Sequence, residues 1–121
     1  MNNENLKQRT KQFALRIVKL VESLPPDEIS RMLGRQLLRA GTSVGANYRA
    51  ACRSKSAADF ISKMGTVEEE ADESGYWMEL LVEAGKIKAA KVSALMPEAS
   101  ELTAIAVSSI NTARKSQRDK I

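Results

Sequence analysis

The sequence predicts an all-α protein folded as an antiparallel up-down-up-down four-helix bundle. Apolar residues recur at the spacing of an amphipathic helix in four successive segments. Aromatic residues, which favour strands, number only five among 121 residues, and only three prolines interrupt the chain. The connections between the four segments are short, and short connections place consecutive helices side by side in opposite directions. A chain of this length is expected to form a single domain over residues 1–121.

The first helix is predicted over about residues 4–24. Its apolar stripe consists of Leu6, Phe13, Ile17, Leu20, Val21 and Leu24. Pro25 and Pro26 end this helix, because proline disfavours helical geometry in the residue before it and has no N–H to donate. Asp27 follows at a position where its carboxylate can cap the next helix.

The second helix is predicted over about residues 28–53. Its inward face consists of Ile29, Leu33, Leu37, Ala40, Val44 and Ala51. Gly41 and Gly45 lie inside this helix, although glycine costs about 1 kcal/mol relative to alanine in a helix interior. Two glycines so close together therefore need compensation from a close contact with another helix or from a local bend, and packing is the favoured role.

Two further helices complete the bundle. The third is predicted over about residues 58–85, and Gly85 marks its end. Its inward residues are Phe60, Met64, Val67, Ala71, Met78 and Leu81. Residues 86–96 have a weak pattern, and their structure is left open. The fourth helix is predicted over about residues 97–115, with fraying expected after Arg114. Its inward residues are Leu102, Ile105, Ala106, Ile110 and Ala113.

The composition argues against an enzyme. The chain has no histidine and a single cysteine, Cys52, which excludes Ser-His-Asp and Cys-His catalysis, histidine-based metal sites and an internal disulfide. We therefore expect no catalytic residue, no metal and no cofactor. No apolar run approaches the roughly 20 residues of a membrane span, and the N-terminus lacks the features of a signal peptide. A cytoplasmic protein without membrane contact is expected.

Charge is distributed unevenly along the chain. Residues 1–58 contain eleven basic and four acidic residues, residues 59–85 one basic and eight acidic, and residues 86–121 seven basic and three acidic. The third helix is therefore an acidic rod between basic neighbours, which can hold helices or subunits together. Within it, Glu70 falls beside the apolar face and needs a partner, which Asn47 or an arginine of the second helix could supply.

Arginines form a ridge on the second helix. Arg31, Arg35, Arg39, Arg49 and Arg53 fall within an arc of about 80°, opposite the apolar face. Guanidinium groups can bind phosphate oxygens through two parallel hydrogen bonds, so the ridge suits nucleic-acid backbone. It equally suits carboxylates of a neighbouring helix or subunit, or a solvated face with ion pairs. Basic residues outside the apolar stripe of the first helix add to this surface; they are Lys7, Arg9, Lys11, Arg16 and Lys19.

Three segments resemble a known protein family. Residues 41–56 read GTSVGANYRAACRSKS and residues 59–63 read DFISK; together they resemble the signature of the four-helix bundle proteins encoded in 23S ribosomal RNA intervening sequences. Residues 69–81, EEADESGYWMELL, match that family's third-helix pattern. Residues 109–114, SINTAR, match its last-helix pattern, with Asn111 where a lysine is usual.

The resemblance implies a homo-oligomer, a ring of five subunits. It also implies kinship with the accessory protein of diversity-generating retroelements, a basic pentameric barrel that binds its reverse transcriptase and nucleic acid. Expected partners are therefore a second copy of the chain, RNA or DNA, and a reverse transcriptase or other protein. Oligomer or helix contacts are expected at Gly41, Gly45, Asn47, Tyr48, Glu70, Tyr76 and Trp77.

Two hypotheses about function follow. The first is a non-catalytic, oligomeric nucleic-acid-binding or ribonucleoprotein accessory protein that uses the basic surface of the first two helices. The second is a protein-interaction scaffold, in which the arginines pair with acids of the third helix across subunits and nucleic acid is not bound.

Overall fold

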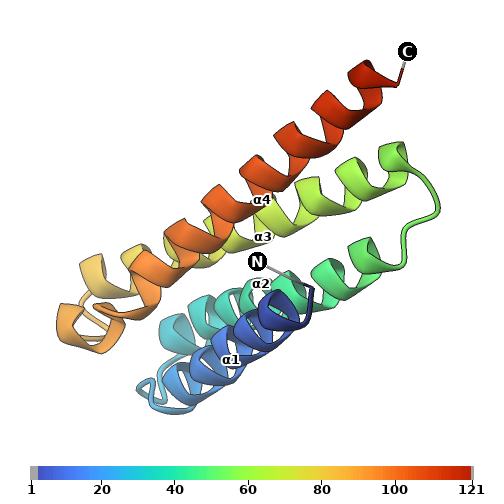
Figure 1. Cartoon of the computed structure of the whole chain (residues 1–121). Coiled ribbons are helices and arrows are strands. Elements are labelled where there is room, and N and C mark those ends of the chain that lie inside the picture. Colours follow the sequence, from blue (N-terminus) through green and yellow to red (C-terminus); the bar gives the residue numbers. More distant parts are fainter. Residues whose placement is uncertain (1–2, 121) are drawn as a thin grey trace.

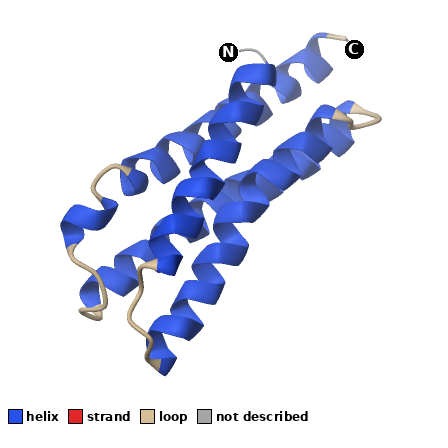
Figure 2. Ribbon diagram, turned by 90° about the horizontal axis from the view of Figure 1, so that it is seen from below, coloured by secondary structure: helices blue, strands red, loops and turns tan. Residues whose placement is uncertain are grey.

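The computed structural model describes residues 3–120 as four long helices and one short 3₁₀ helix. The helices are α1 (Asn3–Glu22), α2 (Glu28–Cys52), α3 (Ala57–Glu83), the 3₁₀ turn η1 (Ala89–Val92) and α4 (Leu95–Asp119). Consecutive long helices run in opposite directions (Figure 1). No strand occurs in the described residues (Figure 2). The all-α bundle predicted from the periodicity is confirmed.

Short polar side chains start two of the helices. Asp27 caps α2 as predicted, because its Oδ1 accepts a hydrogen bond from the Ser30 N–H at 2.8 Å. Ser56 caps α3, where its Oγ accepts from the Asp59 N–H at 3.0 Å. After α3, Gly85 has a φ of +75°, which favours glycine, and the Lys86 N–H reaches back to the Leu81 carbonyl at 2.9 Å. These residues determine where α2 and α3 begin and where the chain leaves α3.

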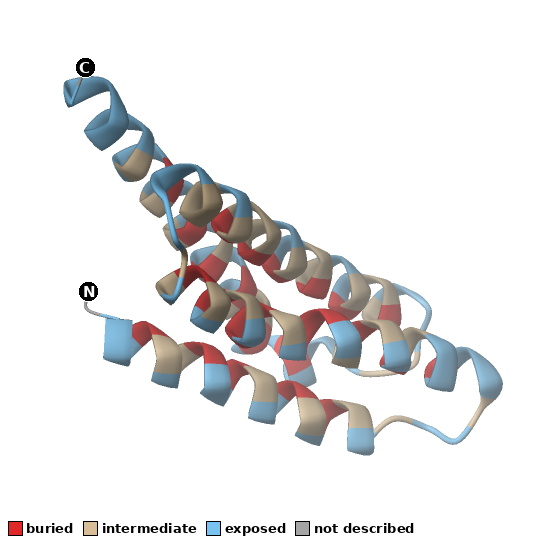
Figure 3. Cartoon of the chain, turned by 90° about the vertical axis from the view of Figure 1, so that its right-hand side faces the viewer, coloured by how far each residue is buried: buried red, intermediate tan, exposed pale blue. Residues whose placement is uncertain are grey.

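The core is apolar and runs along the inside of all four helices (Figure 3). Its largest completely buried side chains are Phe13, Ile17, Leu37, Met64, Met78 and Leu81. Helix α4 contributes Leu95, Ala99, Leu102, Ala106 and Ile110. Every one of these positions follows a helical repeat, so the stripes predicted from the sequence meet in one core.

Glycines bring α1 and α2 close together. A Cβ atom at Gly41 would lie 2.8 Å from Ile17 Cγ1, and one at Gly45 would lie 3.1 Å from Thr10 Oγ1. A Cβ atom at Gly34 would likewise lie 2.8 Å from Leu24 Cδ1. Because the missing side chains leave no gap between the helices, dispersion contacts offset the cost of glycine in a helix.

The helices meet mainly in chain order. The seams α1–α2, α2–α3 and α3–α4 are extensive, whereas α1 and α4 meet over a short stretch. Arg9 joins those two helices: its Nε donates to Glu98 Oε2 at 2.8 Å, and its Nη2 donates to Glu98 Oε1 at 2.7 Å. The same Nη2 lies 2.9 Å from Glu101 Oε1.

The structure departs from the prediction at two places and supplies the structure of one segment that the sequence left open. Ile29 was expected inside but is 57% exposed, because Ser30 takes the inward position of the first turn and bonds to Asp27. Helix α4 continues to Asp119 rather than fraying after Arg114. Residues 86–96 contain η1 and the start of α4, and two residues of this segment, Val92 and Leu95, are buried in the core.

Candidate nucleic-acid interface on α1 and α2

The five arginines of the ridge all lie on the exposed side of α2. The reason is periodicity, since the buried residues of α2 occupy the opposite side and hold it against α1 and α3. The structure nevertheless divides the five arginines into two groups, according to whether a carboxylate lies within reach.

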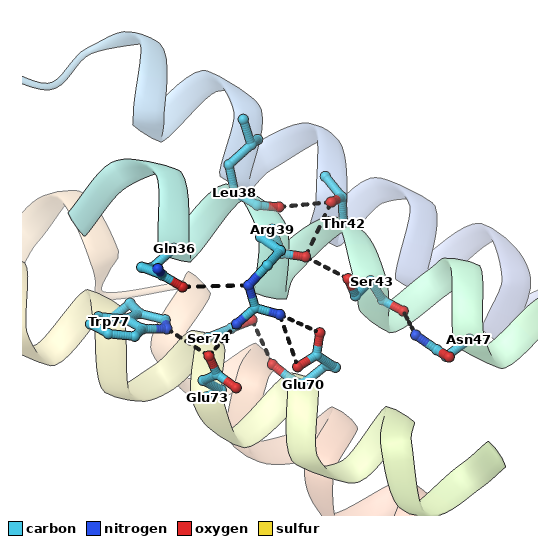
Figure 4. Close-up of polar contacts among 10 residues, drawn as sticks. All are labelled: Gln36, Leu38, Arg39, Thr42, Ser43, Asn47, Glu70, Glu73, Ser74 and Trp77. Atoms are coloured by element: carbon cyan, nitrogen blue, oxygen red, sulfur yellow. Dashed lines mark hydrogen bonds and ion pairs between the residues drawn. The ribbon is translucent and has the colours of Figure 1, made fainter. Parts of the chain in front are cut away.

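Arg39 is engaged within the chain. Its Nη1 donates to Glu70 Oε2 at 3.0 Å, and its Nη2 pairs with Glu73 (Figure 4). The Trp77 Nε1–H donates to the same carboxylate of Glu73 at 3.1 Å. Arg39 thus supplies the partner that Glu70 needs beside the core, and it links α2 to α3. Its guanidinium has little capacity left for phosphate.

The other four arginines have no carboxylate partner within residues 3–120; they are Arg31, Arg35, Arg49 and Arg53. Arg53 Nη1 donates to the Arg49 carbonyl at 3.2 Å and so occupies part of its donor capacity at the end of α2. The three remaining guanidiniums are exposed and have their hydrogen-bond donors available for an anion.

A basic groove runs between α1 and α2. It encloses about 280 Å³. Its walls carry Lys7, Lys11 and Arg49, and its remaining lining is small or uncharged: Thr10, Ala14, Thr42, Gly45 and Ala46. The glycine that allows close helix packing therefore also forms part of the groove, where a backbone can approach three cations.

A second groove of about 300 Å³ lies at the other end of the same seam. Arg31 and Arg35 line it above the apolar residues Val21, Leu24 and Leu38. No acidic side chain lines either groove in the part of the chain that the structure describes. The outer α1–α2 seam therefore carries a basic groove toward each of its ends.

The opposite seam, between α3 and α4, is acidic over much of its length. One groove of about 500 Å³ carries Asp72, Glu79 and the exposed ring of Tyr76. A neighbouring groove carries Glu68 and Glu69 together with Arg114, Asn111 and Ile110. None of these four acids forms an ion pair within the described range, 3–120. The two charge signs thus occupy different sides of the bundle.

The remaining predicted contact residues lie in several environments. Tyr48 is buried, its hydroxyl donates to Asn3 Oδ1 at 3.2 Å, and burial raises the pKa of that hydroxyl. Asn47 donates to the Ser43 carbonyl at 2.8 Å within α2 and does not bond Glu70. Tyr76 stacks edge-on against Trp77, with ring centroids 5.1 Å apart.

The sequence reasoning missed two features of this surface. Arg9 was counted with the basic residues, but Glu98 and Glu101 neutralise it from α4. No local signal could reveal that pairing, since Arg9 and Glu98 are separated by 89 positions. The groove beside Gly45 was also missed. The sequence did contain a pattern that could have predicted this groove, because small residues recur at helical spacing on the side of α2 that meets α1.

Neither a metal-ion cluster nor a membrane-spanning helix occurs among residues 3–120. The acidic side chains and Cys52 form no cluster of three that could hold a metal ion. None of the described helices is both long and apolar enough to cross a membrane.

These observations define a helical-bundle protein with one basic and one acidic seam. Over residues 2–108 the chain matches the family described as 23S rRNA-intervening sequence protein. The chain belongs to that family. A solved structure is similar: a protein with unknown function from the S23 ribosomal protein family of Bacteroides thetaiotaomicron. It is 36% identical, with a TM-score of 0.80 over 86% of this chain and 96% of that one. No curated protein matches the sequence.

Proposed function

We propose that this protein is a non-catalytic nucleic-acid-binding protein that contacts RNA or DNA backbone along the outer α1–α2 seam. The observation that carries the proposal is the lining of the two grooves on this seam. They contain Lys7, Lys11, Arg31, Arg35 and Arg49 and no acidic residue within the described chain.

The chemistry of the seam favours backbone over base recognition. Guanidinium and ammonium groups bind phosphate oxygens, and counterions released from the nucleic acid drive the association. No aromatic side chain lines either groove on this seam, so neither offers a platform on which unpaired bases could stack. Binding is therefore governed by charge and is largely independent of sequence.

The test compares the wild-type protein with the Arg35→Gln/Arg49→Gln variant. Affinity for oligo-dT and for a mixed-sequence RNA duplex is measured over a series of salt concentrations. The logarithm of affinity falls by about 0.7 per phosphate contact on single strands and about 0.9 on duplex for each tenfold rise in salt. We expect the variant to flatten that slope by about one to two units on both probes.

The matched control is Lys88→Gln/Lys91→Gln, which removes two positive charges from exposed residues of the α3–α4 connection. We expect that control to leave the slope nearly unchanged. If the wild-type protein binds neither probe, nucleic-acid binding is refuted. If both double variants behave alike, net charge is responsible and the α1–α2 seam is not the interface.

A second candidate function is supported by the acidic α3–α4 seam. Asp72 and Glu79 lack ion-pair partners within residues 3–120. A second copy of the chain carries the exposed arginines Arg31, Arg35 and Arg49, which could pair with them. The protein would then be an interaction scaffold, assembled head to tail. Light scattering on Arg35→Gln/Arg49→Gln separates the two candidates. Loss of assembly favours the scaffold, whereas intact assembly with weakened binding favours the nucleic-acid interface.

A further inference from the structure

The end of α4 projects beyond the bundle core. Ile110 is the last buried residue of the helix, yet α4 continues as a helix to Asp119. Residues 111–120 are exposed apart from the half-buried Ala113. Figure 3 shows this part of α4 as an exposed helical extension past the neighbouring helices. We call residues 111–120 the α4 extension.

The α4 extension is strongly basic. It contains four basic residues and one acidic residue, and Ala113 is its only aliphatic one. At about 100° per residue, Arg114, Lys115 and Arg118 fall within an arc of about 100°. Arg114 lies at the edge nearest Ile110, where it lines the same groove as Glu68 and Glu69, whereas Lys115 and Arg118 are turned further from the buried stripe of α4. None of the three forms an ion pair within the described chain.

Helix stability does not account for these charges. Cations in the last turn of a helix suit its dipole, which explains Arg118 and Lys120 but not Arg114 and Lys115 one turn earlier. Arg114 and Arg118 are four residues apart, and like charges at that spacing repel each other and destabilise the helix. A ligand that neutralises this face would therefore also stabilise the extension.

The α4 extension lies at the same end of the bundle as the α2–α3 connection (Figures 1 and 3). Residues 49–55, which lead into that connection, contain three basic residues and no acidic residue. One end of the bundle thus presents basic side chains from two helices. An extended polyanion that follows the α1–α2 seam would reach this end beside Arg49.

We propose that the α4 extension is a second nucleic-acid contact, with Arg114, Lys115 and Arg118 binding phosphates of a strand that also occupies the α1–α2 seam. The inference rests on the proposed function. A lipid surface is a poor alternative occupant, because the extension lacks the apolar face that an interfacial helix inserts into a membrane. The extension also lies beyond residue 108, where the family match ends.

The experiment measures the salt dependence of binding to oligo-dT for four proteins. They are the wild type, Arg114→Gln/Arg118→Gln, Arg35→Gln/Arg49→Gln and the control Lys88→Gln/Lys91→Gln. All three variants remove two positive charges. Arg114 and Arg118 lie outside the core, so the fold is expected to survive, and circular dichroism checks this. We expect Arg114→Gln/Arg118→Gln to flatten the slope by about one to one and a half units.

Each outcome has a separate meaning. If Arg114→Gln/Arg118→Gln flattens the slope and the control does not, the α4 extension is a contact site. If Arg35→Gln/Arg49→Gln weakens binding while Arg114→Gln/Arg118→Gln matches the control, the inference is overturned and the proposed function stands. If only Arg114→Gln/Arg118→Gln weakens binding, the proposal that the α1–α2 seam binds nucleic acid is overturned, and the α4 extension is supported as the contact site. If the wild-type protein does not bind, both fail.

Discussion

At the scale of single residues, helical spacing predicted which arginines of α2 face solvent but not which of them find partners. All five ridge arginines are exposed, as their arc predicts. Arg39 differs from the others because it lies on the edge of the ridge nearest α3, where Glu70 and Glu73 reach it. Such a pairing depends on how α2 and α3 are aligned along each other. The spacing of residues within one helix does not predict that alignment.

The ion pair between Arg9 and Glu98 carries a residue-scale prediction about stability. The bidentate hydrogen bond from Arg9 holds the pKa of Glu98 below its usual range. The bond therefore stabilises the fold at pH values above the unfolded pKa, about 4.3, and the stabilisation disappears as pH falls through the lower folded pKa. We expect Glu98→Gln to lower the free energy of unfolding by about 1–2 kcal/mol at pH 7.

The measurement is chemical denaturation at pH 7 and at a series of acidic pH values. The difference between Glu98→Gln and wild type should shrink as the pH falls. Glu101→Gln is the matched control, because Glu101 also contacts Arg9 but its side chain is 61% exposed against 15% for Glu98. Such an exposed partner is worth under about 1 kcal/mol. Equal losses in the two variants would contradict the role assigned to Glu98.

At the scale of the helices, sequence patterns located all four elements and failed where apolar periodicity stopped. Helix α4 continues past Ala113 because Arg, Lys and Gln favour helix without an apolar stripe. The helix starts were better determined, since Asp27 is a strong cap and two prolines precede it. A Cβ atom at Gly34 would lie as close to Leu24, just after α1, as one at Gly41 would lie to Ile17. The sequence analysis singled out only Gly41 and Gly45, so this third close approach was missed.

The glycines give a prediction at this scale. A Cβ atom at Gly41 would lie 2.8 Å and 2.9 Å from two carbons of Ile17, a completely buried side chain. Gly41→Ala should therefore force α1 and α2 apart and cost roughly 1–3 kcal/mol despite the better helix propensity of alanine. Thermal unfolding of the variant measures the loss.

Gly65→Ala is the matched control in α3. A Cβ atom there would meet nothing within 4 Å, so the variant should gain up to about 1 kcal/mol from helix propensity alone. Opposite signs for the two substitutions are the expected result. A gain in stability for Gly41→Ala would show that α1 and α2 can separate at no cost, contrary to the packing described above.

At the scale of the whole molecule, the order of the four helices could be predicted, but the separation of charge into two seams could not. The charge blocks along the chain indicated an acidic helix between basic ones. Only the fold shows that Glu70 and Glu73 pair with Arg39 of the same chain, whereas Asp72 and Glu79 lie in a surface groove without such a partner within residues 3–120. One side of the bundle carries a basic seam and another side an acidic seam. The basic seam of one copy can therefore pair with the acidic seam of the next in a head-to-tail arrangement. Such an arrangement closes into a ring when the rotation between successive copies adds up to a full turn.

We therefore expect a homo-oligomer, and the family resemblance implies five subunits. Light scattering in moderate salt should give a multiple of the 13.3 kDa mass of one chain, five-fold for the ring. If copies meet through the α3–α4 seam, Asp72→Asn/Glu79→Gln should lower the mass while leaving the Arg39 pair and the fold intact. High salt should have the same effect on wild type, because exposed charges are screened within about 3 Å at 1 M ionic strength.

A mass near that of one chain at micromolar concentration would refute the oligomer. A stable oligomer that tolerates both the variant and high salt would place the contact on another face.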